Sequence, residues 1–199
     1  MDTKFKNKAK ILGLDISTKT IGWALFDITG SHLLELTHFS PKIKPQPEDK
    51  IEELLKKADG FRKHLENYKD MGITKVIIEE PLLNSNNVWT VGTLLRYNSM
   101  ITKSIYDLLG VVPHYISTYN SRKYAWPDLV QDNGKGKMVL FGGLPKDIDK
   151  KELIWQRVSA AEPQIVWLYT RNNTLKKECY DQADAYTCVQ GYMRQEGLW

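Results

Sequence analysis

Three apolar segments near the start of the chain are separated by turns so short that they constrain how the segments can pair. The segments cover residues 9–15, 20–27 and 32–38. Parallel strands need a crossover of a dozen or more residues, which these turns do not provide. The chain is therefore predicted to begin with three strands that pair antiparallel in sequence order.

Beyond residue 40 the pattern changes to an alternation of helices and strands. Residues 74–79 form a β-branched run typical of a buried parallel strand, and residues 111–116 predict one more strand. Four helices are predicted, at residues 49–68, 87–109, 149–161 and 178–194. This order favours an α/β fold with a mixed five-stranded sheet and helices on both faces.

The size and composition of the chain suit one globular domain. It has 199 residues, of which 42% are hydrophobic and 26% are charged, so we expect a single domain over residues 1–199. No apolar run is long enough for a transmembrane helix, and no membrane partner is expected. Residues 126–147 are read as a basic insertion, either a hairpin or a mobile loop, and residues 164–170 fit a strand or a helix.

The two cysteines give no sign of a disulfide framework. Cys179 and Cys188 lie nine residues apart on the last predicted helix, and the sequence contains no CxxC pair. This spacing argues against a cysteine-ligated zinc site as well. The simplest expectation is a reducing, cytoplasmic location, in association with the nucleoid or in a phage-infected cell.

Several acids stand where a charge is costly. Asp15 ends the first apolar run, and Glu79 and Glu80 end the run at 74–79, while Asp181 and Asp184 lie one turn apart on the last helix. Carboxylates that cluster need a cation or raised pKa values, and oxygen ligands select Mg²⁺ or Mn²⁺. Spacing alone equally allows separate strand-end caps and helix-surface aspartates.

Basic residues exceed acidic ones by 28 to 24, which gives a formal net charge of +4. This excess is too small to identify a partner by itself. The distribution singles out basic groups in the second half of the chain as candidates for contact with a polyanion such as DNA. These candidates are Arg122, Lys123, Lys135, Lys137 and Lys150. An ordinary solvated surface remains the alternative.

Three segments in order resemble a known family. They are ILGLDISTKTIGWALFD near the start, VIIEEPLL in the middle and YDQADAY on the last helix. In this order and spacing they are similar to the RuvC family of Holliday-junction resolvases, which are RNase H-like nucleases. The similarity extends from about residue 9 to residue 194. It implies an RNase H-like sheet with catalytic acids at two strand ends and on the last helix.

The resemblance also assigns roles to particular residues. It implies two Mg²⁺ ions per site, with Mn²⁺ as a substitute, and Asp15 as the ligand that bridges them. Glu79 matches the second acid, with Glu80 as the alternative. The family also has a lysine before the penultimate helix that helps to neutralise the scissile phosphate. Here it matches Lys151, or else Lys150. The implied metal ligands are Asp15, Glu79, Asp181 and Asp184.

The chain departs from the family pattern after the glutamate. The family has an aromatic residue that wedges between bases, and here that position holds Leu82, next to Pro81. Leu82 is therefore the candidate wedge, with Trp89 or Tyr97 as alternatives. The insertion at 126–147 is longer than the family usually has, and it is a candidate for contact with DNA arms.

The function that the resemblance implies is paired cleavage of a four-way DNA junction in recombination and repair. The protein would act as a homodimer whose contact involves the helix at 87–109, and each site would nick one strand. One alternative is another RNase H-like nuclease, acting on RNA–DNA hybrids or branched DNA. A sugar-kinase or actin-like phosphotransferase is a second, because LDISTKTIGWALFD also resembles that superfamily's first phosphate loop. A non-catalytic junction-binding module is the third.

Overall fold

A five-stranded mixed sheet forms the centre of the computed structural model, which describes residues 9–27, 32–45, 47–81, 87–145 and 147–198. The strand order is β3-β2-β1-β4-β5. The first three strands pair antiparallel, whereas β4 lies parallel to both β1 and β5. The predicted mixed sheet is therefore confirmed. The strands are β1 (Lys10–Ile16), β2 (Ile21–Asp27), β3 (Leu33–Phe39), β4 (Ile73–Glu79) and β5 (His114–Ile116).

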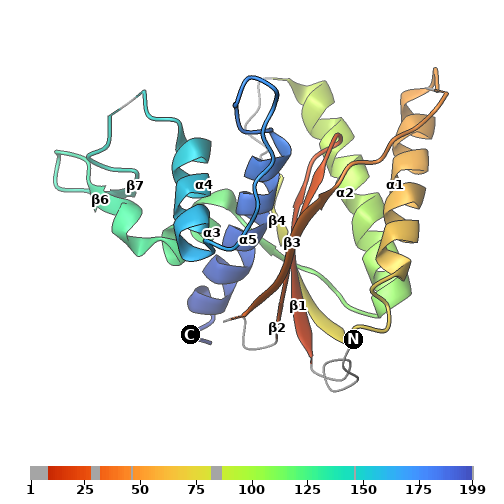
Figure 1. Cartoon of the computed structure of the whole chain (residues 1–199), viewed down its shortest axis with the longest axis horizontal. Helices are drawn as coiled ribbons and strands as arrows, with labels where there is room; N and C mark the ends of the chain where they lie inside the picture. Colours follow the sequence, from red (N-terminus) through yellow and green to blue (C-terminus); the bar gives the residue numbers. More distant parts are fainter. Residues whose placement is uncertain (1–8, 28–31, 46, 82–86, 146, 199) are drawn as a thin grey trace.

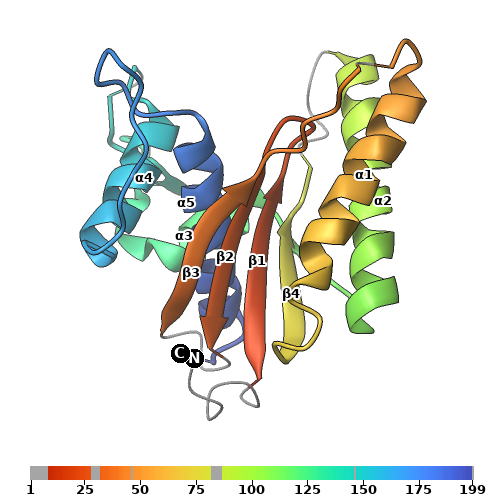
Figure 2. The same cartoon turned by 45° about the vertical axis from the view of Figure 1, so that its right-hand side comes forward.

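Helices cover both faces of this sheet (Figures 1 and 2). Two long helices lie on one face, and three helices lie on the other. The first group is α1 (Lys50–Glu66) and α2 (Val88–Leu109). The second group is α3 (Thr118–Ala125), α4 (Lys150–Ala161) and α5 (Glu178–Gln195). None of the helices in the described part of the chain is both long and apolar enough to span a membrane.

Alternation along β1 divides the core into two layers. Leu12 and Leu14 pack with α1 and α2, while Ile11 packs with α5 on the opposite face. Because side chains alternate along a strand, Gly13 and Asp15 lie on the same face as Ile11. The acid at the end of β1 therefore points toward α5.

Helix α5 lies unusually close to the sheet because two glycines face it. A Cβ atom on Gly13 would stand 2.4 Å from the carbonyl oxygen of Ala185, and one on Gly22 would stand 1.9 Å from that of Asp181. Only glycine permits such an approach of backbone to backbone. These contacts determine the distance between the first turns of α5 and the strands β1 and β2.

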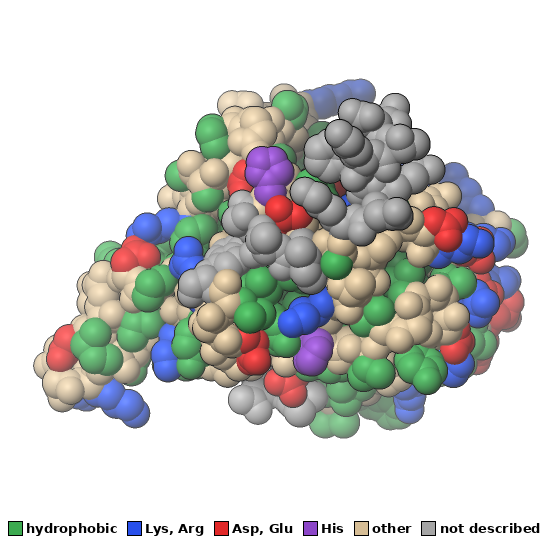
Figure 3. All heavy atoms as spheres, turned by 90° about the horizontal axis from the view of Figure 1, so that it is seen from below, with side chains coloured by type: hydrophobic (Ala, Val, Ile, Leu, Met, Phe, Trp, Pro, Cys, Tyr) green, Lys and Arg blue, Asp and Glu red, His purple; other side chains and the backbone are tan. Residues whose placement is uncertain are grey.

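The segment after β5 differs most from the sequence expectation. Residues 118–125 form α3, which the sequence analysis did not predict, and Ser117 caps it by accepting a hydrogen bond from the backbone N–H of Asn120. The insertion contains a short 3₁₀ helix, η2 (Pro127–Leu129), and a hairpin of β6 (Val130–Asp132) and β7 (Met138–Leu140). The hairpin projects from the body (Figures 1 and 3), and its exposed turn carries Lys135 and Lys137.

Residues 164–170 form neither the strand nor the helix that the sequence allowed. This segment runs without regular structure except for one isolated bridge between Tyr169 and Leu175. It connects α4 to α5 and leaves Val166 exposed. Its far end leads into the start of α5, the helix that carries two of the acids described below.

Candidate active site

Three carboxylates meet where β1, β4 and α5 come together. Asp15 lies near the end of β1, Glu79 is the last residue of β4, and Asp184 lies in the second turn of α5. One carboxylate oxygen from each lies within 4.8 Å of the others. Residues from opposite ends of the chain thus form one acidic cluster, as the family resemblance implied for these three.

The strand alternation selects Glu79 over Glu80. Ile77 packs in the layer under α5 and Ile78 in the layer under α1 and α2, so Glu79 follows Ile77 toward α5 and Glu80 does not. Gly13 of β1 pairs with Ile77 of β4, and two residues further on the same register brings Asp15 beside Glu79. Glu80 is exposed and lies outside the cluster.

Asp181 and Lys151 border the cluster on its open side. The Lys151 Nζ atom, near the start of α4, lies 3.8 Å from Asp181 Oδ1 and 3.7 Å from Asp184 Oδ2. Lys150 does not share this position, because its Nζ lies 5.4 Å from the centre of the Phe141 ring. Of the two lysines that the resemblance allowed, Lys151 is the one that faces the acids.

The acids repel one another and are largely withdrawn from water. Burial, followed by the charges of Glu79, Asp184 and Asp181, raises the pKa of Asp15 well above its usual value. Burial and the charge of Asp184 raise the pKa of Glu79 to about 7. Burial raises the pKa of Asp181 to about 6, although Lys151 opposes that shift. The cluster therefore holds more negative charge than its surroundings balance, and a cation would relieve it.

Arg122 belongs to this site, which the sequence analysis missed. It was expected to contact DNA phosphates from the surface, but its Nη2 donates a hydrogen bond to Asp184 Oδ1 at 2.9 Å, and its side chain is only 10% exposed. One helical turn earlier, the Thr118 hydroxyl donates a hydrogen bond to Glu79 Oε1. Helix α3 thus supplies two donors, four residues apart, that orient two of the three acids.

Cys188 completes the inner wall of the site. It lies one turn after Asp184 on α5, and its thiol donates to Glu79 Oε2 at 3.8 Å. Burial and the neighbouring acids raise the pKa of this thiol well above its usual value. A protonated thiol is a poor metal ligand, so the donors that remain are carboxylate oxygens. Such a set suits a hard divalent cation such as Mg²⁺ or Mn²⁺.

The other DNA-contact candidates form no ion pair with the acids within the described part of the chain. The Lys123 Nζ lies 5.2 Å from the centre of the Tyr124 ring, and Lys135 and Lys137 are exposed at the turn of the β6–β7 hairpin. Their proposed contacts with DNA remain predictions. Leu82 falls outside the described residues.

The two aromatic alternatives for the wedge differ in accessibility. Tyr97 is fully buried among the residues that α2 packs against the sheet, so the suggestion that it wedges between bases is wrong. Trp89, in the first turn of α2, is highly exposed. It remains a candidate.

The sheet order, the acids at the ends of β1 and β4, and the acidic helix across the same face define an RNase H-like fold. Among solved structures, RuvC of Thermus thermophilus in complex with a Holliday junction substrate matches with a TM-score of 0.60 and 11% identity, over 96% of this chain and 97% of that one. Another T. thermophilus RuvC structure matches with a TM-score of 0.55 and 14% identity, over 94% and 96%. The protein thus has a RuvC-like fold over nearly all of the chain. No protein-family model matches the sequence, and no curated protein does either.

Proposed function

We propose that this protein is a metal-dependent endonuclease that cuts four-way DNA junctions. The observation that carries the proposal is the cluster of Asp15, Glu79 and Asp184, whose carboxylate oxygens lie within 4.8 Å of one another in a RuvC-like fold. The RuvC structure with the higher TM-score holds a Holliday junction substrate. The carboxylate set and the fold together support phosphodiester cleavage of branched DNA as the reaction.

The side chains of the cluster have separable tasks. Asp15, Glu79 and Asp184 would hold the divalent ions, two in number by the family resemblance, with Asp181 at the open edge. Bound ions of this kind lower the pKa of an attacking water and stabilise the leaving oxygen. Arg122 and Thr118 hold Asp184 and Glu79 in fixed orientations. Lys151, which is partly exposed beside the acids, orients the scissile phosphate by its charge.

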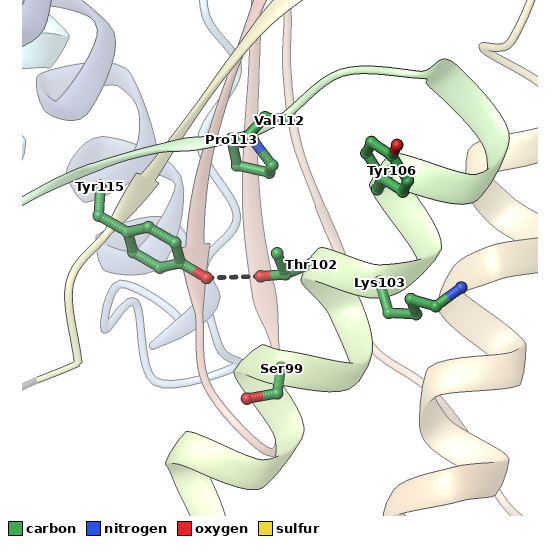
Figure 4. A pocket seen from close by; sticks show the side chains of 7 residues that line it. All are labelled: Ser99, Thr102, Lys103, Tyr106, Val112, Pro113 and Tyr115. Carbon is green, nitrogen blue, oxygen red and sulfur yellow. Dashed lines mark hydrogen bonds between the residues drawn. The ribbon is translucent and has the colours of Figure 1, made fainter.

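The proposal includes a homodimer, because a junction presents two strands for cleavage. The edge formed by α2 and β5 exposes Tyr106, Val112 and Tyr115 around a shallow pocket, where Tyr115 and Thr102 share a hydrogen bond (Figure 4). Apolar side chains grouped on one face are typical of a protein–protein contact. The family resemblance also places the subunit contact on this helix.

Cleavage of synthetic substrates tests the activity. We expect Mg²⁺-dependent paired nicks in a four-way junction and little cleavage of linear duplex. Glu79→Gln should abolish the nicks, while the matched variant Glu80→Gln retains them, because only Glu79 faces the cluster. Preferred cleavage of an RNA–DNA hybrid would favour the other nuclease class. Junction binding without cleavage would favour a non-catalytic module, and ATP-dependent phosphoryl transfer would favour a kinase.

Light scattering during size-exclusion chromatography tests the dimer. Val112→Glu together with Tyr106→Glu should convert a dimer into a monomer, because the charges enter the proposed contact. Val166→Glu is the matched control, since Val166 is even more exposed but lies in the α4–α5 connection. A wild-type monomer at all concentrations would contradict this part of the proposal.

A further inference from the structure

A hollow lies directly beside the acidic cluster, and two of the lysines that line it, Lys19 and Lys177, are not part of that cluster. It has a volume of about 330 Å³ and lies between the β1–β2 turn and the first residues of α4 and α5. Three lysines line it, Lys19 from the turn, Lys151 from α4 and Lys177 from the start of α5. Lys151 is shared with the acidic cluster, so the two sites adjoin.

The hollow has a surplus of positive charge. Its two acids are already engaged, because Asp149 Oδ1 accepts hydrogen bonds from the backbone N–H groups of Lys151 and Glu152, and Asp181 lies beside Lys151. The ammonium groups of Lys19 and Lys177 make no hydrogen bond or ion pair with any described residue. An anion that entered the hollow would therefore meet two unpaired cations.

The turn that presents Lys19 is braced from several directions. The Ser17 hydroxyl donates to the Thr20 carbonyl at 2.8 Å and accepts from the Thr20 backbone N–H at 3.0 Å. Lys57 of α1 donates to the carbonyl oxygen of Thr18 at 2.8 Å. The braced turn fixes the backbone that carries Lys19 at the rim of the hollow, so only its side chain is ordered on binding.

We propose that the hollow lined by Lys19, Lys151 and Lys177 binds a backbone phosphate of the strand being cut, next to the scissile phosphate. The inference rests on the proposed function and adds a path for the DNA strand. The strand passes from the acidic cluster across Lys151 and into the hollow. A free nucleotide would present a phosphate of the same chemistry. The experiments therefore distinguish a phosphate of the DNA backbone from that of a nucleotide.

The test compares two double variants of the full-length protein that lose the same charge. Lys19→Gln with Lys177→Gln removes the two unpaired cations. Lys63→Gln with Lys69→Gln removes two exposed lysines, one in the last turn of α1 and one in the turn that follows it. Junction affinity is measured by fluorescence anisotropy in chelator over a series of salt concentrations. The slope of log affinity against log salt should fall by about 1 for each lysine that contacts phosphate.

We expect the slope to fall by about 2 in the first variant and to stay at the wild-type value in the second. Lys19→Arg with Lys177→Arg should restore the wild-type slope. Equal slopes in the two glutamine variants would overturn the inference, even where the wild-type protein cuts junctions as proposed. A wild-type protein that binds no junction would instead overturn the proposed function.

Calorimetric titration with ATP and with inorganic phosphate tests whether the hollow binds a free nucleotide instead of a DNA phosphate. The DNA assignment predicts no saturable ATP binding by the wild-type protein. Saturable ATP binding that disappears in the Lys19→Gln, Lys177→Gln variant and persists in the α1 control would overturn it. Melting curves of both variants should match the wild type, since all four lysines are exposed.

Discussion

Arg122 and Asp184 form a buried ion pair that connects α3 to α5, with Nη2 2.9 Å from Oδ1 and side chains that are 10% and 4% exposed. The Nε atom of the same guanidinium is buried and has no hydrogen-bond partner among the described residues. The pair therefore holds one oxygen of Asp184 and leaves the other near Lys151. It orients an acid of the candidate metal site without closing the site.

Arg122→Gln should destabilise the protein strongly. Removing one partner of a buried ion pair leaves the other charge uncompensated, which costs about 3–5 kcal/mol. Urea unfolding in chelator measures this loss, and added Mg²⁺ should recover part of it because the cation takes over the balancing of Asp184. Arg157→Gln is the matched control, because Arg157 pairs with Asp128 on the surface at 2.6 Å with side chains 40% and 53% exposed, and its loss should cost at most about 1 kcal/mol. Equal losses in the two variants would contradict the importance of the buried pair.

Asp15→Asn should abolish junction cleavage and leave junction binding largely intact. The change removes a ligand of the proposed metal site but no contact with the DNA backbone. In chelator the variant should also be more stable than the wild type, because burial and the neighbouring Glu79, Asp184 and Asp181 all disfavour the charged form of Asp15. Cleavage assays, anisotropy and thermal melting measure the three effects. Wild-type cleavage by this variant would exclude Asp15 from the catalytic cluster.

The sequence predicted most of the sheet because each strand carries a local signal. Apolar runs and short turns identify β1, β2 and β3, and the β-branched run identifies β4. The choice between Glu79 and Glu80 depends on which face of β4 turns toward α5. A shift of one residue in register exchanges the faces, and the register follows from packing between distant segments, so the local sequence left both acids open.

Helix α3 was not predicted because its burial does not depend on an apolar stripe. Its buried residues are Ser121, Arg122 and Ala125. The helix instead packs closely against Gly191 of α5, where a Cβ atom would lie 2.3 Å from the carbonyl oxygen of Ser121. A polar helix held by backbone contact leaves no periodic signal, and the role of Arg122 was missed with it.

The metal-free protein should lose stability as the pH rises from about 4.5 to about 7. The pKa of Glu79 is about 7 in the folded protein against a usual 4.5, so the folded state binds this proton more tightly than the unfolded chain. The free energy of unfolding therefore falls as the pH rises through this range. Asp181, with a pKa of about 6, acts in the same direction.

Unfolding in chelator between pH 4.5 and 8 measures this dependence. Glu79→Gln should weaken it and leave the part due to Asp181, because glutamine does not titrate, while Glu80→Gln should keep the wild-type dependence. Saturating Mg²⁺ should also flatten the wild-type curve if the cation binds the ionised acids. A wild-type dependence in Glu79→Gln would assign the effect to other groups.

Gly22→Ala should impair cleavage out of proportion to the size of the change. The new Cβ would stand 1.9 Å from the carbonyl oxygen of Asp181, so the start of α5 must move away from the sheet and carry Asp181 and Asp184 with it. Such overpacking costs about 1–3 kcal/mol or more of stability. Displacing the acids should lower the cleavage rate even at temperatures where the variant is fully folded. Single-turnover kinetics at saturating protein measure this rate.

Gly60→Ala is the matched control for this variant. Gly60 lies within α1, and a Cβ there would meet the nearest atom, Phe39 Cζ, at an ordinary 3.6 Å. Alanine in a helix should stabilise the protein by about 0.5–1 kcal/mol and leave the cleavage rate unchanged. If Gly22→Ala folds and cleaves at the wild-type rate, the close contact between β2 and α5 does not set the geometry of the acids. A loss confined to Gly22→Ala would show that the spacing between sheet and helix positions the acids of the candidate site.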